Sequence, residues 1–288
     1  MIDSFIDSLT IDKVQRHHNL QVCFLKSTLV SDMDIKTFDE MKDFVDVTEV
    51  NDGEVPFLSF LNRSPYKILV LSGSLISGNF QDRTVKTGFI LHPYQNTKIS
   101  VFCVEQGRWK DKISRGIKSK YHLSSDIRKN LRKSEQNDIW MKVKEKSERF
   151  KVNSPSGNIQ DIYESRENQI EAFQKALQCN SDHIGIITVI HDKVTSIDVF
   201  AVKGIYPKLH ASIMTSHIVD ALDEQFCEEV RSRKPLTVDA FLKSIREAKR
   251  EYISQDGNGQ IISLESDRVV GDSLLDRDTL LELEAFPV

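Results

Sequence analysis

The sequence predicts an α+β fold with a largely antiparallel sheet, one long helix after a central hairpin, and further helices in the C-terminal half. Between residues 19 and 103, short apolar runs are separated by turn residues, a pattern typical of strands. A long charged stretch without Gly or Pro follows at 124–150. Because strands and helices do not alternate regularly, a doubly wound parallel sheet is not expected.

The first half of the chain is predicted to form mainly strands. They are predicted at residues 20–25, 57–61, 68–71, 85–91 and 99–104. One helix is expected at about 37–45, where apolar side chains recur at helical spacing. The turn 92–96 predicts an antiparallel hairpin that places Arg83 opposite Gln106 or, after a slip by one residue, Glu105.

The second half is predicted to form mainly helices. The clearest one is predicted at 124–150, where Ser124 or Ser125 provides a good N-cap. Other helices are expected at 167–177, about 207–226 and about 237–248, a hairpin at 184–190 and 194–201, and strands in the tail at 259–286. Since no repeat or low-complexity linker marks a boundary, residues 1–288 are expected to form a single domain.

Composition excludes several classes of protein. The chain has 288 residues, 39% hydrophobic and 28% charged, with 39 Lys and Arg against 43 Asp and Glu, which describes a soluble globular protein. The longest apolar run, 184–190, is far shorter than the roughly 20 residues that a bilayer span needs. The first ten residues do not resemble a secretory signal. We therefore expect a cytoplasmic protein without a membrane partner.

Motifs for metals and nucleotides are also missing. The four cysteines are far apart, and neither a CxxC pair nor an HExxH motif occurs. There is likewise no GxxxxGK[ST], GxGxxG or GxSxG sequence. We predict no bound metal and no cofactor.

Charge is distributed unevenly along the chain. Residues 108–151 contain fifteen Lys and Arg against six Asp and Glu, a local charge of +9, whereas residues 252–288 carry −6. Such asymmetry can attract an anionic ligand to one face of a protein. The alternative is a solvated helix with ordinary ion pairs between residues four apart.

The predicted long helix carries a first candidate site. Arg128, Arg132, Gln136 and Trp140 follow at spacings of four and would share one stripe of a continuous helix. Two guanidinium groups, a carboxamide and an indole suit a phosphorylated, nucleotide-like ligand. The alternative is that the tryptophan belongs to the core and the arginines to the surface.

A second candidate site is the sequence CVEQGRW, residues 103–109, at the end of a predicted strand. The predicted hairpin gathers polar side chains at this end, namely Gln81, Arg83, Glu105, Gln106 and Arg108. Glu105 is the candidate general base, because a carboxylate beside cations can orient water. Asp198, inside an apolar strand, is a second candidate catalytic carboxylate. The alternatives are a structural ion pair between Arg83 and Glu105, and a strand aspartate that faces solvent.

These residues also carry a resemblance to a known family. The relevant segments are NLQVCFL at 19–25, GNFQDR at 78–83, CVEQGRW, the helix with Gln136 and Trp140, NSPSG at 153–157, SIDVF with Asp198, and VVGDSLL at 269–275. Over nearly its whole length the chain resembles the ARG and Rhodanese-Phosphatase-superfamily-associated protein domain family. The resemblance implies an association with ADP-ribose-processing and phosphatase-like proteins, a role in bacterial defence, and a partner protein from a defence operon. One departure is that Ser72, Gly73 and Ser74 stand where members usually carry an acidic DGE-like turn. If those acids are catalytic in relatives, this chain only binds.

The first hypothesis is a protein that recognises a phosphorylated small molecule, nucleotide or ADP-ribose-like. The arginines would hold phosphate, the glutamines would orient polar edges, and Trp109 or Trp140 would stack on a ring. An enzymatic version would be a hydrolase or transferase with Glu105 as base. The alternatives are a non-catalytic protein-interaction or structural module, and nucleic-acid binding through the basic region 108–151.

Overall fold

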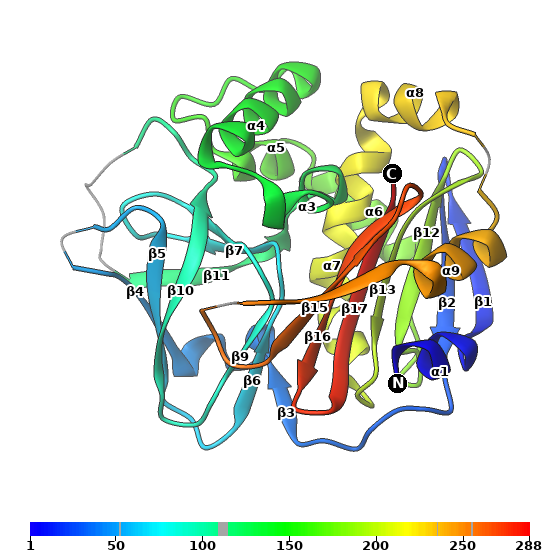
Figure 1. Cartoon of the computed structure of the whole chain (residues 1–288). Coiled ribbons are helices and arrows are strands. Elements are labelled where there is room, and N and C mark those ends of the chain that lie inside the picture. Colours follow the sequence, from blue (N-terminus) through cyan, green and yellow to red (C-terminus); the bar gives the residue numbers. More distant parts are fainter. Residues whose placement is uncertain (52, 109–114, 235, 255) are drawn as a thin grey trace.

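The computed structural model describes residues 1–51, 53–108, 115–234, 236–254 and 256–288. The fold is α+β, as the sequence predicts. Its two main parts are a closed six-stranded barrel and an eight-stranded antiparallel sheet. In Figure 1 the barrel lies on the left and the sheet on the right, with helices packed between and around them.

The barrel is built from the first part of the chain. In spatial order its strands are β10 (Asn96–Cys103), β5 (Phe57–Asn62), β4 (Val45–Glu49), β11 (Arg115–His122), β7 (Ser74–Ser77) and β8 (Arg83–Val85). A smaller sheet lies beside it: β3 (Ile35–Thr37), β6 (Lys67–Val70) and β9 (Phe89–Leu91). The predicted helix at 37–45 is the short helix α2 (Phe38–Met41) followed by the 3₁₀ turn η1 (Lys42–Phe44).

The hairpin predicted around residues 92–96 is only partly correct. The single strand expected at 85–91 is two strands, because β8 pairs with β10 whereas β9 leaves to pair with β6. The register prediction is wrong, since Arg83 lies opposite Cys103 rather than Gln106 or Glu105. It assumed that both strands continue straight from the turn, but β9 pairs elsewhere.

The large sheet joins strands from both ends of the chain. Its order is β1 (Thr10–His17), β2 (Leu20–Lys26), β12 (Gly185–Ile190), β13 (Lys193–Phe200), β17 (Thr279–Pro287), β16 (Val269–Asp276), β15 (Gln260–Glu265) and β14 (Lys249–Ile253). Side chains alternate between its two faces. Val22 and Phe24 join the cluster that contains helix α7 (Ile205–Leu222). Cys23 and Leu25 pack with helices α1 (Ile2–Asp7) and α9 (Val238–Glu247) on the opposite face (Figure 1). The predicted hairpin at 184–190 and 194–201 is confirmed.

Helix α7 connects the barrel to the sheet. Fourteen of its eighteen residues are buried, as expected for a helix surrounded by protein on all sides. Thr215 accepts a hydrogen bond from the backbone of His122 in β11, and the helix also packs on β12 and β13. One hydrophobic cluster contains residues of both parts. The single-domain organisation stays a prediction.

The long helix predicted at 124–150 is interrupted. It consists of α3 (Ser125–Arg128), the 3₁₀ turn η2 (Leu131–Lys133) and α4 (Gln136–Phe150). Ser134 and Glu135 are extended, and Glu135 caps α4 by exchanging hydrogen bonds with Asp138. Arg128 and Arg132 therefore do not share a helical stripe with Gln136 and Trp140.

The other helices surround these elements. They are α5 (Ile159–Ser165), α6 (Glu167–Ala176) and α8 (Glu224–Ser232). The predicted helices at 167–177 and 237–248 are confirmed as α6 and α9, whereas the one expected at 207–226 is α7 followed by a separate α8. No helix in the described ranges is long and apolar enough to cross a membrane.

Gln136 joins α4 to the barrel. Its Oε1 accepts the backbone N–H of Cys103 at 2.8 Å, and its Nε2 donates to the carbonyl of Cys103 at 2.9 Å. The side chain therefore satisfies both backbone groups of the last residue of β10. This contact gives Gln136 a structural role.

We expect Gln136→Ala to lower the free energy of unfolding by about 2 kcal/mol, because two backbone groups in a partly buried position lose their partners. Asn137→Ala is the matched control, since Asn137 is the exposed neighbour on the same helix. It should change stability by less than about 0.5 kcal/mol. Urea unfolding of both variants measures the difference, and equal stabilities would contradict this role.

Candidate functional site

The polar side chains that were predicted to gather around CVEQGRW do lie together. Their guanidinium groups, however, are already paired with other groups of the protein. Arg108 donates from Nε to Glu105 at 2.9 Å and from Nη2 to Asp82 at 2.9 Å. Its Nη1 donates to the carbonyls of Gly78 and Asn79 at 3.0 and 2.9 Å. This guanidinium therefore already has carboxylate and carbonyl partners. Trp109 lies outside the described residues.

Glu105 is poorly suited to act as the base that the sequence suggests. Burial works to raise its pKa, but hydrogen bonds from Arg108, Ser156 and the backbone of Asp82 hold the pKa below its ordinary value. The side chain is only 3% exposed. The carboxylate is thus ionised, buried and occupied by internal donors.

The neighbouring residues are structural as well. Arg83 has no exposed surface, and it contacts Oε1 of Gln81 at 3.4 Å and Glu49 at 3.8 Å. Gln81 in turn donates to the backbone carbonyl of Gln106 at 3.1 Å. The geometry agrees with the alternative in which this cluster fastens strand ends, although the predicted ion pair of Arg83 with Glu105 is replaced by separate partners.

A second group of carboxylates lies on the large sheet. Asp198, Glu284 and Asp272 are direct cross-strand neighbours on β13, β17 and β16, and Glu282 follows on the same face of β17. We call these four residues the acidic row. Like charges directly opposite each other destabilise a sheet, so the row needs compensation.

Two of the predicted arginines provide this compensation. Arg128 Nη1 donates to Asp198 at 2.6 Å and to Glu284 at 2.7 Å. Arg132 Nε donates to Asp272 at 3.0 Å. The structure therefore brings together Arg128, Arg132 and Asp198, which the sequence analysis selected separately. It adds Asp272, which lies in the segment VVGDSLL, and Glu284, which alternates with Glu282 in a strand-like segment.

The acidic row contains groups with opposed pKa shifts. Burial raises the pKa of Glu284 to about 8. The positive charge of Arg128 works to lower this pKa, whereas the negative charges of Asp198 and Asp272 help to raise it. Burial also raises the pKa of Asp272 to about 6 and that of Glu282 well above its usual range. For Asp198, Arg128 and His217 outweigh burial and hold the pKa well below its usual range. Near neutral pH, Asp198 is ionised and Glu284 is protonated.

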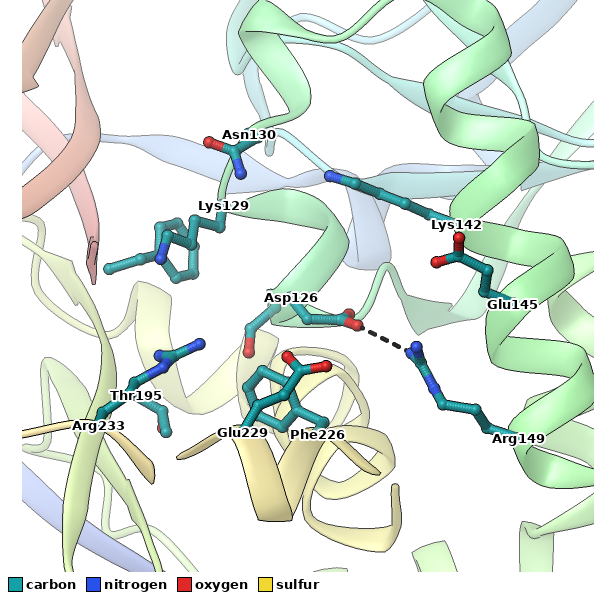
Figure 2. A pocket seen from close by; sticks show the side chains of 12 residues that line it. Asp126, Lys129, Asn130, Lys142, Glu145, Arg149, Thr195, Phe226, Glu229 and Arg233 are labelled. Carbon is teal, nitrogen blue, oxygen red and sulfur yellow. Dashed lines mark ion pairs between the residues drawn. The ribbon is translucent and has the colours of Figure 1, made fainter. Parts of the chain in front are cut away.

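A cavity of about 260 Å³ lies beside this region, between α3, α4 and α8 (Figure 2). Its lining includes four cations: Lys129 at the end of α3, Lys142 and Arg149 on α4, and Arg233 after α8. Figure 2 shows Lys129 and Arg233 extending toward the same space from one side and Lys142 from the other. We call this the cationic cavity.

The charges of the cationic cavity are not fully compensated. Arg149 pairs with Asp223 at 2.9 Å and with Asp126 at 3.6 Å. Within the part of the chain that the structure describes, no ion pair is found for Lys129, Lys142 or Arg233. Burial, together with the charges of Arg233 and Lys142, lowers the pKa of Lys129 to about 8. Such a group of cations favours an anion in the cavity.

The sequence indicates the positive charge of this cavity but not the residues that line it. Lys129, Lys142 and Arg149 belong to the basic region 108–151. The stripe that was followed from Arg128 assumed an unbroken helix. Because the helix is interrupted before α4, Lys142 and Arg149 of α4 line the cavity with Lys129 at the end of α3, whereas Gln136 and Trp140 do not.

The remaining candidates lie elsewhere. Trp140 lines a separate cavity of about 220 Å³ together with Gln106, Lys144 and Asn153. Its indole N–H is buried without a hydrogen-bond partner among the described residues. Gln136 is held by the backbone of β10. No group of three His, Cys, Asp or Glu side chains in the described ranges is arranged to hold a metal ion.

Comparison with known proteins identifies one family. The family model that matches residues 8–286 is that of the ARG and Rhodanese-Phosphatase-superfamily-associated Protein domain. No curated protein and no solved structure matches the chain.

The pKa shifts of the acidic row predict how stability changes with pH. The folded chain keeps a proton on Glu284 up to about pH 8, whereas the unfolded chain releases it near the ordinary value of 4.5. The free energy of unfolding should therefore fall as pH rises through this interval, by an amount on the order of 2 kcal/mol. Urea unfolding at several pH values between these limits measures the slope.

Glu284→Gln should reduce this slope, because the amide cannot release a proton yet still accepts a hydrogen bond from Arg128. Glu251→Gln on β14 is the control, since Glu251 is exposed and pairs with Lys249. It should leave the slope unchanged. An identical slope in native protein and Glu284→Gln would show that Glu284 does not hold the proton.

Proposed function

We propose that this chain, which belongs to the ARG and Rhodanese-Phosphatase-superfamily-associated Protein domain family, binds a phosphorylated small molecule in the cationic cavity. The observation that carries the proposal is the convergence of Lys129, Lys142 and Arg233 on one space, without ionic partners among the described residues. Neighbouring cations repel one another, and a bound anion would relieve the repulsion that the lining carboxylates of Asp126, Glu145 and Glu229 leave uncompensated. Phosphate, with several acceptor oxygens, matches these donors.

The size of the cavity limits the part of a ligand that it encloses. About 260 Å³ lies just below the range of roughly 300–1,000 Å³ that is typical of small-molecule sites. A phosphate with an attached sugar fits this space better than a complete dinucleotide. In a nucleotide or ADP-ribose-like ligand, the phosphorylated sugar would occupy the cavity and the base would extend beyond it.

Other polar groups around the cavity support a sugar-like ligand. Glu145 and Glu229 also line it, and both are exposed residues. Carboxylates accept hydrogen bonds from hydroxyl groups, so these two side chains suit the sugar part of such a ligand. The family name, which refers to Rhodanese-Phosphatase-superfamily proteins, agrees with a phosphate-containing ligand. As part of the same proposal, the chain hydrolyses this ligand and acts in bacterial defence.

The test compares two lysines of α4 that differ in position. Lys142 lines the cationic cavity, whereas Lys144 lies two residues further along, is largely exposed and pairs with Glu148. Calorimetric titration with inorganic phosphate, ribose 5-phosphate and ADP-ribose should detect binding to the native chain. Lys142→Gln should weaken binding about tenfold, because a charge-assisted hydrogen bond contributes about 1.5–3 kcal/mol.

Lys144→Gln removes the same charge outside the cavity and should leave the affinity nearly unchanged. An equal loss in the two variants would indicate attraction by overall charge instead of a defined site. If the native chain binds none of the three probes, the proposed function is wrong.

A further inference from the structure

A serine with a carboxylate partner lines the cationic cavity. Ser125, in the first turn of α3, is one of the lining residues. Its hydroxyl donates a hydrogen bond to Oδ2 of Asp220, on α7. A hydroxyl held in this way has its oxygen lone pairs free to attack an electrophile, and its proton has an acceptor in place.

The environment of Asp220 suits proton transfer. The side chain is fully buried, and its Oδ1 accepts a hydrogen bond from Lys146 at 3.0 Å. Its Oδ2 also accepts the backbone N–H of Asp126 at 3.0 Å, so the carboxylate is held firmly in one orientation. Burial and the nearby charge of Asp126, opposed by Lys146, raise its pKa to about 7. A general base is most effective when its pKa lies near the working pH.

We propose that Ser125 is the nucleophile of a phosphoryl transfer in the cationic cavity, with Asp220 as its general base. This inference rests on the phosphate site proposed above. The lining cations would stabilise the charge on the phosphoryl oxygens during transfer, as cations do in other phosphoryl-transfer sites. The substrate class is therefore a phosphate monoester or an acyl phosphate whose phosphoryl group occupies the cavity.

The reaction balances without an external oxidant or reductant. Oγ of Ser125 forms a bond to phosphorus while the bond from phosphorus to the leaving oxygen breaks. The hydroxyl proton passes to Asp220 and from there to the leaving group, which departs as an alcohol or acid. Water then attacks phosphorus, releases inorganic phosphate and returns the proton to Oγ.

A purely structural role for the same contact makes a different prediction. In that case the hydrogen bond to Asp220 only ties α3 to α7, and Ser125 never becomes phosphorylated. Covalent trapping separates the two roles, because loss of stability cannot produce a phosphoserine.

The experiment incubates the full chain with acetyl phosphate or 4-nitrophenyl phosphate and quenches the mixture with acid. Intact-mass measurement should show one added phosphoryl group, and peptide mapping should place it on Ser125. Ser125→Ala should carry no phosphoryl group and should lose turnover of 4-nitrophenyl phosphate, while it still binds inorganic phosphate. Asp220→Asn should form the adduct much more slowly.

Ser124→Ala is the matched control. Ser124 is an equally buried neighbour whose hydroxyl donates to Asp126 at 2.6 Å instead of to Asp220. This variant should be phosphorylated like the native chain. If Ser125→Ala or Asp220→Asn fails to fold, the mapped position of the adduct in native protein still decides the question.

The possible outcomes separate this inference from the proposed function. Phosphate binding without an adduct on Ser125 from either donor would overturn the nucleophile and leave the binding site intact. An adduct on another residue would also overturn it. Absence of phosphate binding would remove both proposals together.

Discussion

The arrangement of helices around the cationic cavity depends on one buried ammonium group. Lys146 of α4 has no exposed surface and lies within 3.2 Å of three carboxylates, on Asp126, Asp220 and Asp223. These acids raise the pKa of Lys146 despite its burial. Because removal of one partner from a buried charge network costs several kcal/mol, the network fixes α4 against α3, α7 and the start of α8. The walls of the cavity are set by this contact.

The need of buried charges for partners also explains why the helix predicted at 124–150 is interrupted. Helix α3 is held on two sides, since Asp126 reaches Lys146 and Arg128 reaches the acidic row on the sheet. A straight continuation of α3 into α4 could not satisfy both contacts and also bring Lys146 back to Asp126. The buried charges therefore outweigh the helix propensity of residues 129–135, and the capping pair of Glu135 and Asp138 restarts the helix in a new direction.

This competition marks the limit of what the sequence could predict. Apolar runs and turn residues were sufficient for the α+β class, most strands of the sheet and helices α6 and α9, because local pattern and burial agree there. The charge excess of 108–151 also indicated the region of the cavity. Arg128, Arg132 and Asp198 could be named from the sequence, but neither their pairing nor the lining of the cationic cavity could be predicted, since these depend on cross-strand register and on a helix break caused by residues far along the chain. Asp220 is an example: it lies in an apolar helix and contacts Ser125, 95 positions away.

Ion pairs between distant segments of the chain connect the acidic row with the region of the cationic cavity. The acidic tail, residues 252–288, supplies Glu265, Asp272 and Glu284, which bind Arg128, Arg132 and Lys133 of the basic region. Ser72 lines a small cavity with Asp272 and Glu284, so a carboxylate at this position would place a further negative charge beside the acidic row. Among the described residues, Lys129 and Lys142 make no ion pair with these acids, so their positive charges remain at the cationic cavity.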